Sequence, residues 1–252
     1  MDDARRVQLR TLLENPVFSI DAPDDVALHR YDQALTHSSY GDADNERMEF
    51  YGDCVLDFLI GRELYGSFDR RSLRLRERFP ALKDEALLTD MLHEITNDRN
   101  LAAIAGNIPG FDAAIRRGPG QQLTPSIRAG AFEALVAAIC DDRGIEKTGN
   151  VIRELFRDRI EHAEPIVSWK NKLQECVQKQ EPSAKVSDII QYRTSREEGT
   201  PDHDARHYSE VYVRLGGQDW ERWGTGHGRR GKDAEMDAAR DAVGRHCVHP
   251  HS

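Results

Sequence analysis

The chain has 252 residues, of which 35 are lysine or arginine and 44 are aspartate or glutamate, so its formal net charge is −9. A hydrophobic fraction of 38% is enough for an ordinary folded core and excludes wholesale disorder. No apolar run approaches the ~18 residues that a membrane span needs, and the start, MDDARRVQLR, lacks a signal peptide's apolar stretch. We therefore expect a soluble, cytoplasmic protein that does not bind membranes.

The first two thirds of the chain has the apolar periodicity of helices. Apolar residues recur every three or four positions in ARRVQLRTLL, DDVALHRYDQAL, residues 45–64, KDEALLTDMLHEI, IRAGAFEALVAAI and GNVIRELFRDRI. Proline and glycine separate these runs at Phe79-Pro80, 108–110 and 118–120. We predict an all-α domain over residues 1–160.

The acidic excess belongs entirely to this first part. Residues 1–164 contain 21 basic and 30 acidic residues, whereas residues 165–252 contain 14 of each. The helical periodicity of the apolar residues ends at the same place, because Pro165 disfavours helix at the residue before it. We therefore place a linker at 161–168. The net charge of the whole chain is an average over two regions of different charge.

The second region predicts a small α+β domain over residues 169–247. WKNKLQECVQKQ has helical spacing, and a last helix is expected from about Gly231 to Gly244. Between them, AKVSDIIQYR, HYSEVYVRL and QDWERWGTG alternate as strands do. The predicted order is α-β-β-β-α.

Cysteine spacing gives no sign of a metal cluster or of a disulfide framework. The four cysteines are Cys54, Cys140, Cys176 and Cys247. They are far apart and form no C-x-x-C pair, so we expect four free thiols.

Three carboxylates share one face of the helix predicted at 45–64. Glu46, Glu49 and Asp53 stand at i, i+3 and i+7, which aligns their side chains. A solvated helix face is the ordinary explanation of such a row. Against it, the segment is strongly apolar and Arg47 is its only cation before Ile60. Repelling acids in an apolar setting indicate a shared cation.

A further carboxylate, Glu133, interrupts the apolar run AGAFEALVAAI. A buried carboxylate without a partner costs several kcal/mol, so Glu133 needs a metal, a base or access to water. If its helix packs on the first one, Glu49, Asp53 and Glu133 converge as the hard oxygen ligands that Mg²⁺ prefers. Mg²⁺ held by such a cluster typically assists attack of water on a phosphodiester.

These motifs carry a family resemblance. ALTHSSYGDADNERMEFYGDCVL at 34–56 closely resembles the signature of ribonuclease III, a double-strand-specific endoribonuclease. RGPGQ at 117–121 and AGAFEALVAAICDD at 129–142 resemble the second half of that nuclease domain. KLQE at 172–175, PDH at 201–203 and GHGRRGKDAEMDAA at 226–239 resemble a double-stranded-RNA-binding domain. The resemblance covers nearly the whole chain in the family's order.

The resemblance implies roles for the nuclease residues. Glu49, Asp53 and Glu133 match metal ligands, with Asp53 and Glu133 in the catalytic positions, and the implied cofactor is Mg²⁺, with Mn²⁺ as a substitute. Glu46 matches an outer acid that shapes the site. Phe50 matches a residue that inserts into the partner subunit of a homodimer, although the sequence alone would favour ordinary core packing for this phenylalanine.

One departure concerns the metal site. The family's second segment reads A-D-x-x-E-A, whereas Gly130 stands here at the position of the expected metal-binding aspartate. Losing one anionic ligand weakens the attraction for a divalent cation, but water can fill a vacated octahedral position. Asp57, one turn beyond Asp53, would assist through a water or remain a solvated surface residue.

In the second domain, the resemblance implies contacts to double-stranded RNA, which proteins recognise by its shape, 2′-hydroxyls and phosphates. Glu175 and His203 are expected to approach successive minor grooves. The start of the last helix is expected to face the phosphates between them, where Arg229, Arg230 and Lys232 supply positive charge.

Two functions follow. The first is a Mg²⁺-dependent endoribonuclease that cuts double-stranded RNA as a homodimer, leaves 5′-phosphate and 3′-hydroxyl ends, and processes ribosomal and other precursor RNA. The alternative is a weakened or inactive RNA-binding protein on the same fold, which Gly130 motivates. Retention of Glu46, Glu49, Asp53 and Glu133 favours the enzyme.

Overall fold

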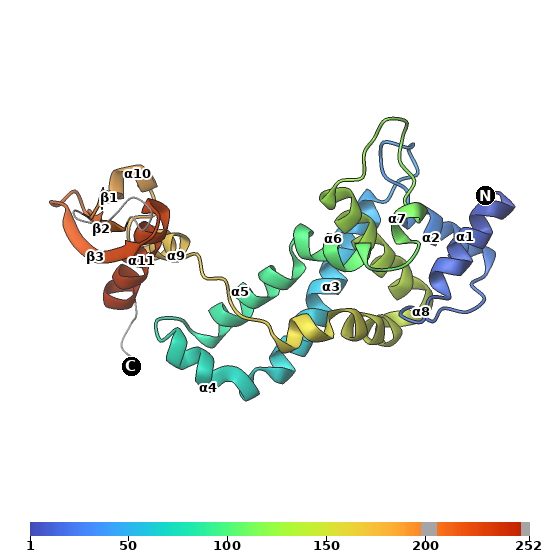
Figure 1. Ribbon diagram of the computed structural model, residues 1–252, viewed down its shortest axis with the longest axis horizontal. Helices are drawn as coiled ribbons and strands as arrows, with labels where there is room; N and C mark the ends of the chain where they lie inside the picture. Colours follow the sequence, from blue (N-terminus) through green and yellow to red (C-terminus); the bar gives the residue numbers. More distant parts are fainter. Residues whose placement is uncertain (198–205, 248–252) are drawn as a thin grey trace. The chain divides into compact units, whose positions relative to one another are not determined.

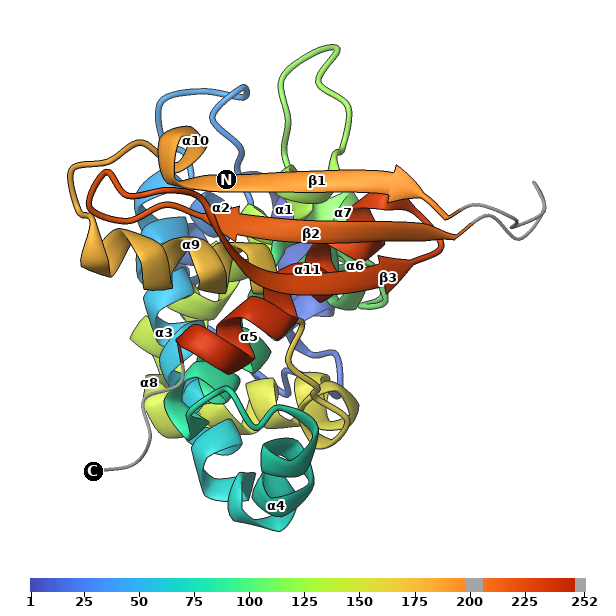
Figure 2. The same ribbon diagram turned by 90° about the vertical axis from the view of Figure 1, so that its left-hand side faces the viewer.

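The computed structural model describes residues 1–197 and 206–247 (Figures 1 and 2). The chain divides into two compact units, one of residues 1–71 with 88–165 and the other of residues 72–87 with 166–252. Among the described residues, no helix combines the length and the apolar character that a membrane crossing requires.

The first part of the chain is helical. Its helices are α1 (Asp3–Leu13), α2 (Asp25–Ala34), α3 (Glu46–Ser67), α4 (Asp69–Arg78), α5 (Asp84–Thr96), α6 (Asp98–Gly106), α7 (Phe111–Ala114) and α8 (Pro125–Glu161). The described part of 1–165 has no strand, only an isolated bridge between Thr36 and Arg116. The predicted all-α fold is confirmed.

Local signals explain several helix starts. The side chains of Asp2, Asp24 and Asn97 each accept a hydrogen bond from a main-chain N–H in the first turn of α1, α2 and α6. Thr124 does the same for α8, and Pro125 occupies the first helical position, which tolerates proline. α8 joins two separately predicted helices through a kink at Gly144, whose φ is 79°.

The sequence pattern missed α4 because its segment, DRRSLRLRER, is too polar to show a core-facing stripe. The structure buries only two of its side chains, those of Ser72 and Leu75. By contrast, α3 and α8 pack along each other through the centre of the first unit (Figure 1). Large side chains close the core there, including the fully buried Tyr31, Phe132 and Phe156.

The second unit contains a three-stranded antiparallel sheet in the order β1-β2-β3. Its elements are α9 (Trp169–Gln180), α10 (Val186–Ile189), β1 (Ile190–Arg196), β2 (His207–Val213), β3 (Glu221–Gly228) and α11 (Gly231–His246). The predicted α-β-β-β-α order is confirmed. The first strand starts later than expected, because Val186–Ile189 forms a helical turn.

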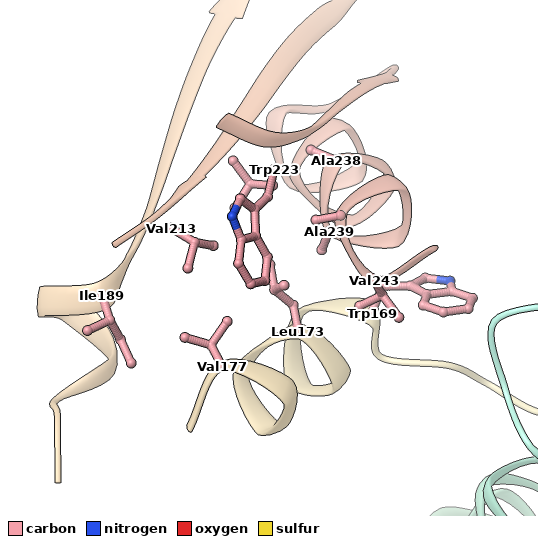
Figure 3. Packing of buried hydrophobic residues seen from close by; sticks show 11 residues of the cluster. Trp169, Leu173, Val177, Ile189, Val213, Trp223, Ala238, Ala239 and Val243 are labelled. Atoms are coloured by element: carbon pink, nitrogen blue, oxygen red, sulfur yellow. The ribbon is translucent and has the colours of Figure 1, made fainter. Parts of the chain in front are cut away.

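One face of the sheet is covered by α9 and α11 (Figure 3). Leu173 and Val177 of α9 meet Val213 and Trp223 of the sheet, and Ala238 belongs to the same cluster from α11. The small alanines of α11 allow the helix to lie close to the strands. This core positions the start of α11, where the basic residues lie.

A disulfide joins the two ends of this unit, and it corrects the expectation of four free thiols. Cys176 of α9 and Cys247, at the end of α11, are bonded with their α-carbons 5.9 Å apart. Cys54 and Cys140 are free. The pairing was invisible in the sequence because the two cysteines are 71 positions apart and meet only when α9 packs on α11.

Candidate active site

The site begins where α3 crosses α8. A Cβ atom placed on Gly52 would lie 1.8 Å from the main-chain carbonyl oxygen of Glu133, so only glycine allows this approach. Asp53 follows Gly52 directly, and the close crossing therefore brings it to the same place as Glu133. The sequence predicted this meeting of two helices, but not the glycine that permits it.

All four predicted carboxylates line one hollow of about 470 Å³. Its walls are His37, Ser38, Asn45, Glu46, Glu49, Phe50, Asp53, Ser126, Ile127 and Glu133. Glu46 and Asp53 are exposed, whereas Glu49 and Glu133 are half-buried. His37, Ser38 and Asn45 were not singled out as site residues, although all three belong to the motif at 34–56.

The carboxylates repel one another at the site. Burial, followed by the charges of Asp53 and Glu49, raises the pKa of Glu133 to about 8. Burial also raises the pKa of Glu49, with Asp98 and Glu46 adding to it. The pKa of Asp53 is raised by burial and by the charge of Asp57. The pocket thus holds more negative charge than its own groups neutralise.

Two further acids belong to this electrostatic environment. Asp57 is only half-exposed, and its Oδ1 is buried with no hydrogen-bond partner among the described residues, so its carboxylate is not fully solvated. Asp98, in the first turn of α6, raises the pKa of both Glu49 and Glu133. No sequence pattern marks Asp98, because an acid at a helix start is ordinary.

Gly130 leaves room for the carboxylate of Glu49. A Cβ atom at residue 130 would be 2.4 Å from Oε2 of Glu49 and 2.7 Å from its Cδ. The Glu49 carboxylate thus lies in the space that a side chain at 130 would need. The missing aspartate has not left a gap, since a neighbouring carboxylate lies there.

The residues present suit a divalent cation. The acidic side chains in the pocket are carboxylates, the hard oxygen type that Mg²⁺ prefers. A positive charge among them would lower the raised pKa values of Glu49, Asp53 and Glu133. In the described part of the chain, no three His, Cys, Asp or Glu side chains stand close enough to hold an ion as they are. Metal ligation by Glu49, Asp53 and Glu133 stays a prediction.

An apolar row runs along the exposed side of α3. Phe50 is 75% exposed, Phe58 is 58% exposed and Tyr65 is 78% exposed. Their spacing of eight and seven residues places them on one side of the helix. Phe50 is therefore not a core residue within its own chain.

The predicted RNA-binding residues of the second unit are at the surface. Glu175 on α9 is exposed, and so are Arg229, Arg230 and Lys232 at the start of α11. Arg230 forms a two-pronged ion pair with Asp233, with both N–O distances 2.9 Å. This pair partly neutralises Arg230, whereas Arg229 and Lys232 form no ion pair within the described residues. His203 lies outside the described residues.

Known proteins resemble both parts of the chain. Residues 29–160 match the family model described as ribonuclease-III-like, and residues 169–244 match that of the double-stranded RNA binding motif. Ribonuclease 3 of Clostridium beijerinckii is 34% identical over 223 residues, covering 83% of this chain and 86% of that protein. Ribonuclease 3 of Bdellovibrio bacteriovorus is 33% identical over 227 residues, covering 84% of this chain and 87% of that protein.

A solved structure is also similar. The crystal structure of the nuclease domain of ribonuclease III from Campylobacter jejuni is 26% identical and has a TM-score of 0.48. The match covers 63% of this chain and 96% of that chain.

Proposed function

The chain belongs to the ribonuclease III family of endoribonucleases and carries a double-stranded-RNA-binding domain; from this premise we propose that it hydrolyses double-stranded RNA at the α3–α8 pocket with the help of Mg²⁺. The observation that carries the proposal is the shared pocket of Glu49, Asp53 and Glu133. Their mutual repulsion is reduced by a cation, which attracts phosphate in turn.

In this mechanism Glu49, Asp53 and Glu133 would hold the ion, and Mn²⁺ would be able to replace Mg²⁺. When bound, the ion supplies an activated water and offsets the charge of the reacting phosphate. Asp53 and Glu133 orient the water for attack on phosphorus. The water oxygen bonds to phosphorus, the bond from phosphorus to the 3′ oxygen breaks, and a proton from the water passes to that oxygen, which leaves 5′-phosphate and 3′-hydroxyl ends. Glu46, exposed at the pocket wall, shapes the path of the RNA.

The functional unit is proposed to be a homodimer. The support is the row of Phe50, Phe58 and Tyr65, since three large apolar side chains exposed on one helix favour burial against a partner. A second copy of the chain fits, because a two-fold interface matches a surface with itself. Each copy supplies one site, so the two sites cut opposite strands and leave short 3′ overhangs.

The second unit is proposed to bind the duplex by its shape. Glu175 and His203 contact the minor grooves, and the N-terminus of α11 faces the phosphates with Arg229, Arg230 and Lys232. The exposure of Glu175 and of the three cations supports this assignment. Because residues 165–252 carry equal numbers of basic and acidic residues, we expect modest affinity with a steep salt dependence.

Precursors of ribosomal RNA and other structured RNA are the proposed substrates, and the cytoplasm is the proposed compartment. Support for the substrate class is the pairing of a nuclease unit with a domain for double-stranded RNA. The bond between Cys176 and Cys247 is uncommon in a reducing compartment, so its redox state bears on the location.

A second candidate function is RNA binding without efficient cleavage. Gly130 favours it, because the site has one anionic ligand fewer than the family pattern, and Glu49 lies where that ligand would stand. The enzyme remains the better-supported function because four carboxylates near a polyanionic substrate would weaken binding unless a cation joins them.

The deciding experiment measures cleavage of long double-stranded RNA with and without Mg²⁺. We expect cleavage only with Mg²⁺ and only of the duplex, with single-stranded RNA of the same sequence left intact. Glu133→Gln should lower the cleavage rate at least 100-fold. The matched control is Glu146→Gln, an exposed glutamate on the same helix, which should cut like the wild type.

RNA binding is measured in parallel by gel shift in Ca²⁺. If the wild type binds duplex RNA but does not cut it at saturating Mg²⁺ or Mn²⁺, the enzymatic proposal fails and the binding function stands.

A further inference from the structure

A second polar pocket lies at the far ends of α3 and α8, away from the carboxylates. Its volume is about 320 Å³. Its lining includes Ser67, the glutamates Glu63 and Glu161, and the arginines Arg70, Arg71, Arg153 and Arg157. Ser67 is 18 positions after Glu49 on the same helix, which at 1.5 Å per residue is roughly 27 Å from the active site. The two pockets are therefore separate.

The lining is basic in a region that is otherwise acidic. Four arginines face two glutamates in this arginine pocket, whereas residues 1–164 contain 21 basic and 30 acidic residues. Two of the arginines are already paired. Arg153 donates to Oε1 of Glu63 from two nitrogens, at 2.9 and 3.2 Å, and Arg157 pairs with Glu154.

Arg70 and Arg71 have no such partner. Arg71 donates to the Ser67 hydroxyl at 2.8 Å and to the Ala163 carbonyl at 3.4 Å, both of which are neutral acceptors. Among the described residues, neither guanidinium forms an ion pair with a carboxylate. Glu63 and Glu161 also line the pocket, but within the described part of the chain neither of them forms an ion pair with Arg70 or Arg71.

This arrangement is unfavourable for the two guanidinium groups. Arg71 is half-buried, and its pKa is lowered by burial and then by the charge of Arg70. An anion would relieve both effects, because it restores lost hydration and separates like charges. Guanidinium groups recognise oxyanions through parallel N–H donors, and two neighbouring arginines offer more donors than one carboxylate can accept.

We propose that the arginine pocket binds a phosphate group. A phosphate offers several oxygens and up to two negative charges, which match the forked donors of Arg70 and Arg71. Arg157, which faces the same pocket and is 55% exposed, supplies a third guanidinium. The phosphate comes either from the backbone of RNA or from a free phosphate. Phosphate binding by the arginine pocket does not depend on catalysis at the pocket of Glu49, Asp53 and Glu133.

The first arm of the test is calorimetric titration of the full chain with inorganic phosphate in chloride buffer. We expect one saturable site per chain. Arg70→Gln/Arg71→Gln should weaken binding at least tenfold, and Arg71→Lys, which keeps the charge and loses the fork, should weaken it less. The matched control Arg10→Gln/Arg30→Gln removes two positive charges from α1 and α2 and should leave phosphate binding unchanged. Circular dichroism verifies that all variants are folded.

The second arm measures binding of a 12-base-pair RNA duplex in Ca²⁺ over a range of salt concentrations. If the RNA backbone is the source of the phosphate, Arg70→Gln/Arg71→Gln should reduce the slope of log affinity against log salt by about 1 to 2. If free phosphate is the source, the salt slope of Arg70→Gln/Arg71→Gln equals that of the control variant, although this double variant no longer binds inorganic phosphate in the calorimeter. Absence of a saturable phosphate site, together with an RNA affinity equal to that of the control variant, overturns the proposal.

Discussion

The α-carbon of Gly52 lies against the main-chain carbonyl of Glu133, so closely that a methyl group at residue 52 would be 1.8 Å from that oxygen. This contact sets how near α3 comes to α8. Asp53, the residue after Gly52, thereby reaches the pocket that Glu133 lines. The crossing of two helices at one glycine is what assembles the carboxylates.

Gly52→Ala should therefore destabilise the protein, although alanine is normally the better helix former. The clash involves backbone, which cannot rotate away, so we expect a loss of about 3 kcal/mol in the free energy of unfolding and reduced cleavage. Gly66→Ala is the control on the same helix, because a Cβ there meets nothing within 4 Å. It should stabilise by up to ~1 kcal/mol in urea unfolding. Equal effects of the two substitutions would contradict the close crossing.

Gly130→Asp should alter the metal dependence of cleavage. The new carboxylate adds an anionic ligand, and Glu49 must move because its Oε2 would be 2.4 Å from the added Cβ. We expect the Mg²⁺ concentration for half-maximal cleavage to fall several-fold. Gly130→Ala displaces Glu49 without adding charge, so it should not lower that concentration. Identical Mg²⁺ titrations for the two variants would show that position 130 acts only through its size.

The stability of the metal-free protein should depend on pH through Glu133. Its folded-state pKa of about 8 exceeds the ordinary value of 4.5, so the folded state holds the proton more tightly than the unfolded chain. This contribution to stability is fully present below pH 4.5 and is lost as the pH rises through about 8. Thermal unfolding in EDTA should show the wild type losing stability relative to Glu133→Gln over this interval. Parallel curves for the two proteins would refute the assignment.

Phe50→Glu should dissociate the proposed homodimer. Phe50 is 75% exposed in the single chain, and a charge placed in a buried apolar contact weakens it strongly. We expect the dimer dissociation constant, measured by sedimentation, to increase at least 100-fold, or about 3 kcal/mol. Val26→Glu on α2 is the control, since Val26 is also exposed, at 69%, but lies outside the row on α3. A dimer that survives Phe50→Glu would place the interface elsewhere.

Reduction of the bond between Cys176 and Cys247 should destabilise the RNA-binding unit. A bond that closes a loop of 71 residues contributes about 4 kcal/mol in the chain-entropy account. Tryptophan fluorescence can follow the unfolding, because Trp169 and Trp223 lie in the core of this unit. Dithiothreitol should lower the Tm of the wild type and of Cys54→Ser, and should leave Cys176→Ala unchanged. No response of the wild type to the reductant would mean that the bond is absent in solution.

The sequence by itself determined the type of each domain and the identity of the four carboxylates. Helical and strand periodicities are local properties, so the predicted all-α and α-β-β-β-α regions could be read from residue spacing. The acids stood out for a related reason: Glu46, Glu49 and Asp53 share a helix face, and Glu133 breaks an apolar run. The resemblance to ribonuclease III then followed from contiguous motifs.

Only the tertiary structure decided which distant residues meet. Asp98 joins the electrostatics of the site from α6, and Glu49 lies over Gly130, although nothing near them in the sequence indicates either relation. The pairing of Cys176 with Cys247 and the position of Arg70 and Arg71 beside the end of α8 are of the same kind. Such contacts depend on how closely helices pack, and packing distance is set by side chains on both partners at once. Spacing along one segment carries no information about the other.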